Sequence, residues 1–81
     1  MLLEEEFKKA LSLKEEPKSF LLMIDLVLLA RSKNISDKEI KATLLHLFVK
    51  YYEEGENNNE ESRDKADKIA DLLDAIEYDR V

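Results

Sequence analysis

The most apolar stretch of the chain is residues 20–30, which hold ten apolar residues and a single Asp. The run is too short to cross a bilayer, which takes about 20 residues. Its leucine and methionine content, without any alternation of polar positions, favours a buried helix over a strand. We therefore predict a helix over about 17–33, and we expect it to be the most buried helix of the fold.

Three further segments are amphipathic at the helical period. In each of them apolar residues recur three or four positions apart, as on the face of a helix that packs on a core, and charged residues fill the other positions. One Gly and one Pro leave little room for a turn-rich β architecture. The sequence therefore predicts a single-domain, all-α bundle of four helices, at about 2–13, 17–33, 37–54 and 60–78.

Capping signals mark the junctions between these helices. Ser36 and Glu39 match a capping box at the start of the third helix, and Asn34 can take the left-handed position that ends the second. Gly55 is expected to end the third helix. Asn59, or the asparagine before it, can cap the fourth helix. These signals predict short connections, and the short turn at Asn34 favours crossed second and third helices.

One side of the second helix admits polar groups. At 100° per residue, Asp25 falls opposite Met23 and Val27, with Leu22 and Leu29 beside it. In one interpretation Asp25 lies at the rim of the core, and its carboxylate reaches water, a lysine or a neighbouring helix. In the other, Asp25 and the two leucines face a second subunit or another protein. A fully buried, unpaired carboxylate would cost several kcal/mol and is excluded.

Charge is unevenly distributed along the chain. The net charge of −6 argues against a general attraction to nucleic acid or to an anionic membrane. Residues 18–50 nevertheless carry six positive and three negative groups, a net charge of +3. The rest of the chain carries seven positive and sixteen negative groups, a net charge of −9. This segregation indicates either attraction between the parts of one molecule or a single basic face.

An acidic stripe follows the predicted fourth helix, opposite its apolar face. It comprises Asp64, Asp67, Asp71 and Asp74, which recur at intervals of three and four residues. The sequence has neither the Glu-x-x-His pairs of helical metal sites nor a calcium-loop pattern, so we predict no metal. The stripe is interpreted either as a solvated surface or as a docking surface for a basic protein.

The sequence offers no constellation of catalytic residues. His46 is the single His and has no nucleophile or orienting carboxylate at a suitable spacing, and there is no Cys. With Gly55 as its only Gly, the chain has no phosphate-binding glycine loop. We therefore predict a protein that is not an enzyme and has no cofactor or small-molecule substrate. The acidic N-terminus lacks the positive charge of a secretory signal, so we expect a cytoplasmic protein without a membrane association.

Residues 30–40 resemble the turn of a helix-turn-helix motif. Ala30 stands where the first helix of that motif needs a small residue, and Asn34 stands at the usual Gly. Ile35 and Ile40 fall where the motif places core residues. This resemblance implies that the helix after the turn would lie in the major groove of DNA.

The sequence is therefore compatible with two functions. The first is a small acidic, non-enzymatic protein-interaction module, a regulator or adaptor. Its partner would be another protein, for example a basic one, or a second copy in a homodimer. The contact surface would be the acidic stripe or the side of the second helix with Leu22, Asp25 and Leu29. The alternative is a helix-turn-helix-like DNA-binding regulator that reads DNA with residues 37–54, where the groove-facing side chains would be those of Lys38, Lys41 and His46.

Overall fold

The structure, a computed structural model, describes residues 2–81. Helices are the only regular elements in this range, and the all-α, four-helix prediction is confirmed. Their bounds are α1 (Leu3–Leu11), α2 (Lys18–Ser32), α3 (Asp37–Glu56) and α4 (Glu60–Glu77). The predicted bounds agree with these to within about two residues, which is the scatter expected at helix ends.

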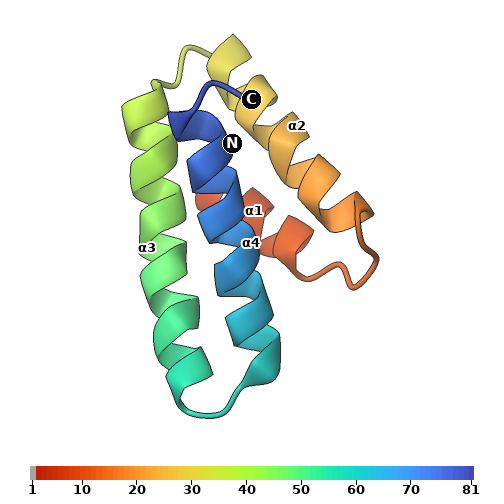
Figure 1. The fold of residues 1–81 in the computed structure, drawn as a ribbon. Helices are drawn as coiled ribbons and strands as arrows, with labels where there is room; N and C mark the ends of the chain where they lie inside the picture. The colour runs from red at the N-terminus through yellow and green to blue at the C-terminus, as the bar shows by residue number, and fades with distance from the viewer. Residues whose placement is uncertain (1) are drawn as a thin grey trace.

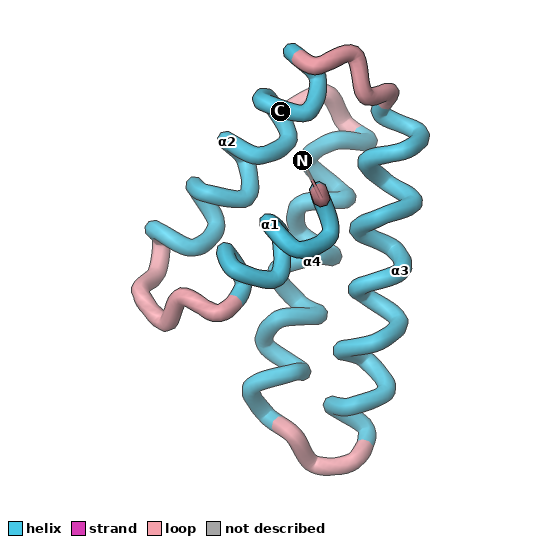
Figure 2. The backbone as a smooth tube through the Cα atoms, turned by 180° about the vertical axis from the view of Figure 1, so that it is seen from behind, coloured by secondary structure: helices cyan, strands magenta, loops and turns pink. Residues whose placement is uncertain are grey.

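Two of the helices form an antiparallel pair, and the other two pack against this pair at an angle (Figure 1). Helices α3 and α4 lie side by side and antiparallel, and α2 diverges from α3 at the short turn that joins them (Figure 1). The view from behind shows that α1, the shortest helix, lies between α2 and the α3–α4 pair (Figure 2). Most of the contact that α2 makes is therefore with α1, and much of its surface has no neighbouring helix.

Every helix contributes side chains to one core. The residues that are fully buried and large are Phe7 from α1, Met23 and Val27 from α2, Ile40, Leu44 and Leu47 from α3, and Ile69 and Leu72 from α4. In each helix these residues recur at the spacing of a single helical face. Within α3 and α4 the buried residues recur three and four positions apart, as the helical period of these segments predicted.

The turn between α2 and α3 forms as its capping signals predict. Asn34 takes a left-handed conformation with φ 66°, and the Ile35 N–H donates to the Ala30 carbonyl at 3.0 Å. This is the hydrogen bond of a Schellman motif, which satisfies a carbonyl at the end of a helix. At the start of α3 the Ser36 hydroxyl accepts a hydrogen bond from the Glu39 N–H at 3.2 Å. The left-handed turn at Asn34 and the Ser36 half of the capping box are therefore confirmed.

Gly55 has a different role from the one predicted. Helix α3 continues to Glu56, and the left-handed residue of the following loop is Asn58, with φ 68°. Gly55 is instead buried where α3 meets the first turn of α4, and a Cβ atom there would lie 3.3 Å from the Arg63 Cα. The glycine therefore permits a close approach of two helices rather than ending one of them. Asn59 caps α4, as expected, by accepting a hydrogen bond from the Ser62 N–H at 3.1 Å.

Candidate interaction surface

The outer side of α2 carries a cluster of exposed leucines, which we call the leucine face. It consists of Leu21, Leu22, Leu28 and Leu29 around Asp25, and the leucines are 54, 37, 49 and 43% exposed. The sequence placed Leu22, Asp25 and Leu29 together on this side, and the structure does bring them together. Leu21 and Leu28 extend the same face on its other flank and were not singled out from the sequence.

The opposite side of α2 explains why these leucines are left exposed. Met23, Val27 and Ala30 are fully buried against the other helices, so the packed side of α2 is a narrow stripe. None of the helices in residues 2–81 is long and apolar enough to cross a membrane. The expectation that this helix is the most buried one stays a prediction, because it depends on what covers the leucine face.

Asp25 is exposed at the centre of the leucine face. The neighbouring cations along the helix pair elsewhere, since Lys18 lies 3.9 Å from Glu15 and Arg31 lies 2.8 Å from Asp37. The carboxylate of Asp25 is thus open to solvent, with leucines on both sides. Solvent contact agrees with the rim interpretation, and the surrounding leucines agree with the interface interpretation.

The charge of α2 sets it apart from the other helices. It carries two basic groups and one acidic group, and of the four helices in residues 2–81 it alone has a net positive charge. Helix α4 has seven acidic and three basic groups, α3 has five and three, and α1 has three and two. The two cations of α2, Lys18 and Arg31, lie near the ends of the helix and are paired with Glu15 and Asp37, so the leucine face between them carries only the charge of Asp25.

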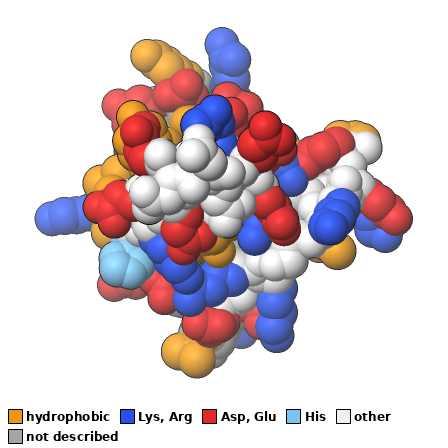
Figure 3. All heavy atoms as spheres, turned by 90° about the horizontal axis from the view of Figure 1, so that it is seen from below, with side chains coloured by type: hydrophobic (Ala, Val, Ile, Leu, Met, Phe, Trp, Pro, Cys, Tyr) orange, Lys and Arg blue, Asp and Glu red, His pale blue; other side chains and the backbone are white. Residues whose placement is uncertain are grey.

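The acidic stripe of α4 is exposed along its whole length but is mixed with cations. Asp64, Asp67, Asp71 and Asp74 are all exposed. Lysines follow the same helix, and the end of the molecule that carries the α3–α4 loop shows acidic and basic side chains intermingled (Figure 3). The stripe is therefore a surface of mixed charge at its N-terminal end, which weakens the attraction expected for a basic protein.

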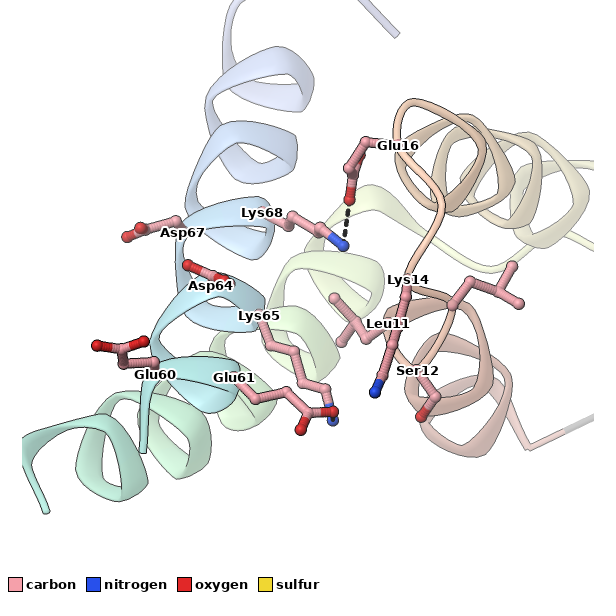
Figure 4. A pocket seen from close by; sticks show the side chains of 11 residues that line it. Leu11, Ser12, Lys14, Glu16, Glu60, Glu61, Asp64, Lys65, Asp67 and Lys68 are labelled. Carbon is pink, nitrogen blue, oxygen red and sulfur yellow. Dashed lines mark ion pairs between the residues drawn. The ribbon is translucent and has the colours of Figure 1, made fainter. Parts of the chain in front are cut away.

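An open cavity of about 560 Å³ lies between the end of α1, the α1–α2 loop and the first half of α4 (Figure 4). Its lining carries both signs of charge and includes Lys14, Lys65 and Lys68, whereas the side chains of Asp64 and Asp67 project from the side of α4 away from the α1–α2 loop (Figure 4). Lys65 and Lys68 are already paired with Glu61 and Glu16, respectively. The cavity therefore has no convergent set of free polar groups of the kind that fixes a small molecule.

A buried polar cluster borders this cavity, and no local pattern in the sequence indicated it. The Ser19 side chain is fully buried, donates to the Ala10 carbonyl at 2.8 Å and accepts from the Lys68 ammonium at 3.2 Å. Lys68 also forms an ion pair with Glu16. A Ser beside a Lys is a known nucleophile and base pair. Here, however, the Lys68 ammonium donates a hydrogen bond to the Ser19 hydroxyl, and that hydroxyl donates one to the Ala10 carbonyl. The pair therefore connects α1, α2 and α4.

The predicted DNA-reading residues of α3 do not form one basic face. Lys41 donates to Glu77 at 2.8 Å, and His46 lies toward α1 with its Nε2 atom 3.5 Å from a Glu4 carboxylate oxygen. Lys38 is exposed on the outer side of the helix. The hydrogen bond from Lys41 lowers the pKa of the Glu77 carboxyl, as expected for a formed ion pair.

The outer side of α3 is instead partly apolar. Leu45, Val49 and Tyr52 are 54, 48 and 53% exposed and form a strip along the helix, which we call the α3 strip. The Tyr52 ring stacks on Phe48 with centroids 5.7 Å apart. These side chains are exposed because α1 and α4 cover the other sides of α3 and leave this one open.

Comparisons with known proteins do not assign the chain. No protein-family model matches it, and no curated protein or solved structure is significantly similar to it. Within residues 2–81 no group of three or more His, Cys, Asp or Glu side chains is arranged to hold a metal ion. The function of the protein is therefore inferred from its exposed surfaces.

Proposed function

We propose that this protein is a non-enzymatic interaction module that binds another protein chain through the leucine face of α2. The observation that supports the proposal is the leucine face itself, with four leucines 37–54% exposed on one side of a 15-residue helix. A helix that is apolar all round is normally buried on every side. Large contiguous apolar patches on a single chain are typical of protein contact sites.

The geometry of α2 favours a helical partner. The helix is about 22 Å long at 1.5 Å per residue, and its exposed side carries two pairs of leucines, one on each side of Asp25 along the helix. A second helix laid along this side would bury the leucines from both flanks, as in other helix-on-helix contacts. In such a complex α2 would be covered on both sides and would become the most buried helix of the assembly. Such a contact surface is sufficient for a regulator or adaptor that acts by binding another protein.

The test compares matched surface variants in a binding assay. Leu22→Glu with Leu29→Glu disrupts the leucine face, and Leu45→Glu with Val49→Glu changes an equally exposed apolar site on the α3 strip. A third variant, Asp67→Lys with Asp71→Lys, reverses charge on the acidic stripe. A protein captured from the source cells is purified and titrated against each variant, whose helical content is checked by circular dichroism.

The proposal requires that only the first variant loses binding, by roughly tenfold or more, which corresponds to about 1.4 kcal/mol. Equal losses in the α3 variant would show that the contact is not specific for α2. A loss confined to the charge-reversed variant would place the partner on the acidic stripe instead. The proposal would also fail if the unmodified chain bound no protein, itself included.

A further inference from the structure

Opposite charges lie at equal distances from the centre of the α3 strip. Lys38 precedes Leu45 by seven residues, and Glu56 follows Val49 by seven. Seven residues are two helical turns to within about 20°, so both charged side chains lie on the side of α3 that carries the strip. Both are exposed, and neither side chain forms an ion pair within residues 2–81. The strip is therefore bordered by a free cation at one end and a free carboxylate at the other.

We propose that the α3 strip binds a second copy of this chain, with the two α3 helices facing each other in antiparallel directions. The two-fold axis that relates the copies lies in the plane between the helices, perpendicular to them and level with Leu47. It sets Leu45 against the partner's Val49 and Lys38 against the partner's Glu56, and each contact occurs twice. The strip and the leucine face lie on different helices, so this inference does not rest on the proposed function.

Charge selects this occupant and this orientation. Along the centre of the open side of α3, the antiparallel copy meets an opposite charge at both ends of the strip. A parallel copy would instead place Lys38 against Lys38 and Glu56 against Glu56. The net charge of −6 on each copy opposes any dimer, but charges more than about 8 Å apart are largely screened at physiological ionic strength. The contacts at the ends of the strip therefore decide the orientation.

A hollow beside Tyr52 can receive the partner's Lys38. It measures about 180 Å³ and opens between α3 and α4, where its lining includes the Tyr52 ring and the carboxylates of Glu56 and Asp67. Arg63 also lines it, but the Arg63 guanidinium donates to a backbone carbonyl of α3 at 3.2 Å. An aromatic ring and carboxylates both attract an ammonium group. The flexible four-carbon stem of a lysine lets the ammonium reach this hollow from the facing helix.

The contact is small, so the dimer should be weak. Its apolar part is the α3 strip, whose three side chains are each about half exposed. An interface of this size lies at the small end of specific contacts, and we expect a dissociation constant between about 1 μM and 1 mM. In sedimentation equilibrium at physiological ionic strength, the mass should rise from 9.5 kDa toward twice that value as the concentration increases.

Charge exchange tests the register. Lys38→Glu and Glu56→Lys should each weaken the dimer by roughly tenfold or more, because each variant creates two contacts between like charges. An equimolar mixture of the two variants should associate as the unmodified chain does, since both end contacts of the mixed pair then join opposite charges. Each substitution also favours the helix, because it adds an acid near the N-terminus or a base near the C-terminus of α3. A loss of association therefore does not reflect a weakened fold.

Variants on the two apolar surfaces locate the contact. Leu45→Glu with Val49→Glu should stay monomeric, because it places carboxylates at the centre of the dimer contact. Leu22→Glu with Leu29→Glu changes equally exposed leucines on α2 and should associate as the unmodified chain does. Circular dichroism checks that each variant keeps its helical content.

Three results would overturn the inference. The unmodified chain could stay monomeric up to about 1 mM. The mixture of Lys38→Glu and Glu56→Lys chains could associate no better than either variant alone, which would exclude the antiparallel register. The dimer could be lost in the leucine-face variant and kept in the α3 variant, which would place the contact on α2. Binding of another protein to the leucine face is measured separately, so the proposed function stands or fails independently of these results.

Discussion

The Nζ atom of Lys68 lies 3.2 Å from the hydroxyl oxygen of Ser19, although 49 positions separate the two residues in the chain. This contact joins α4 to α2, and the hydrogen bond from Ser19 to the Ala10 carbonyl extends it to α1. Among the described residues no buried side-chain nitrogen or oxygen lacks a hydrogen-bond partner. The cluster is therefore a complete polar connection between three helices at the edge of an apolar core.

Replacing Ser19 should destabilise the fold. Ser19→Ala removes the acceptor of the Lys68 ammonium and one donor to the Ala10 carbonyl, so the free energy of unfolding should fall by about 1–2 kcal/mol. Urea unfolding followed by circular dichroism measures the change. Ser12→Ala is the control, because that exposed hydroxyl also bonds a helix carbonyl, at Lys8, and should change stability by less than about 0.5 kcal/mol. Equal effects in the two variants would show that burial of the Ser19 cluster adds nothing.

Gly55→Ala should destabilise the α3–α4 pair even though alanine is the better helix former. The substitution gains about 1 kcal/mol of helix propensity. The added Cβ, however, would lie 3.3 Å from both the Cα and the Cβ of Arg63, and a backbone position in a packed helix cannot yield as a side-chain tip can. We expect a net loss of about 1 kcal/mol in thermal or urea unfolding. Glu56→Ala at the exposed neighbouring position is the control, and a stabilised Gly55→Ala protein would contradict the close approach.

The turn between α2 and α3 depends on the left-handed conformation of Asn34. Asn34→Gly should keep or raise stability, whereas Asn34→Ala should lower it by about 1 kcal/mol, since a Cβ without a local hydrogen bond is strained at φ 66°. Chemical unfolding of the pair of variants measures the difference directly. Asn57→Ala, at a residue with φ −94°, should show no comparable loss. If alanine were tolerated equally at both sites, the left-handed turn would not be required.

The sequence was informative where its signals are local. Ser36 and Asn34 act on backbone groups within four residues of themselves, so their motifs could be recognised without knowing the fold. The apolar periods of α3 and α4 were equally readable, because each of these helices presents one stripe to one core.

Features that depend on how the helices pack together could not be predicted from the sequence. The leucines at 21 and 28 look like core residues in a run that is apolar all round, and only the arrangement of the other helices leaves them exposed. The contact between Ser19 and Lys68 joins distant segments and leaves no local pattern. Gly55 carried a valid local signal for a helix end, but the same residue type also serves close packing.

The ion pair between Arg31 and Asp37 should be visible in an acid titration. The hydrogen bond from the guanidinium lowers the pKa of the Asp37 carboxyl below its ordinary value of 3.8. The stabilisation from this pair is therefore present above pH 3.8 and is lost as the pH falls through the lower pKa of the folded state. Carboxyl NMR should show the Asp37 pKa rising toward 3.8 in Arg31→Gln. The neighbouring Lys33→Gln variant should leave it unchanged, and an unaltered titration in Arg31→Gln would show that the pair does not persist in solution.

Binding to duplex DNA provides the sharpest test of the helix-turn-helix alternative, and we expect none. Lys41 is neutralised by Glu77, and the side of α3 that would enter the groove presents Leu45 and Val49 to the phosphates. The net charge of −6 adds a general repulsion, so no mobility shift should appear even near 50 mM salt, a concentration at which phosphate contacts are strong. If a shift did appear, Lys38→Glu should abolish it, and Lys14→Glu in the loop between α1 and α2 should not. A salt-sensitive shift that depends on Lys38 and not on Lys14 would mean that α3 binds phosphate in spite of its apolar strip. The leucine face would then have to be explained as a dimer contact between two DNA-binding subunits.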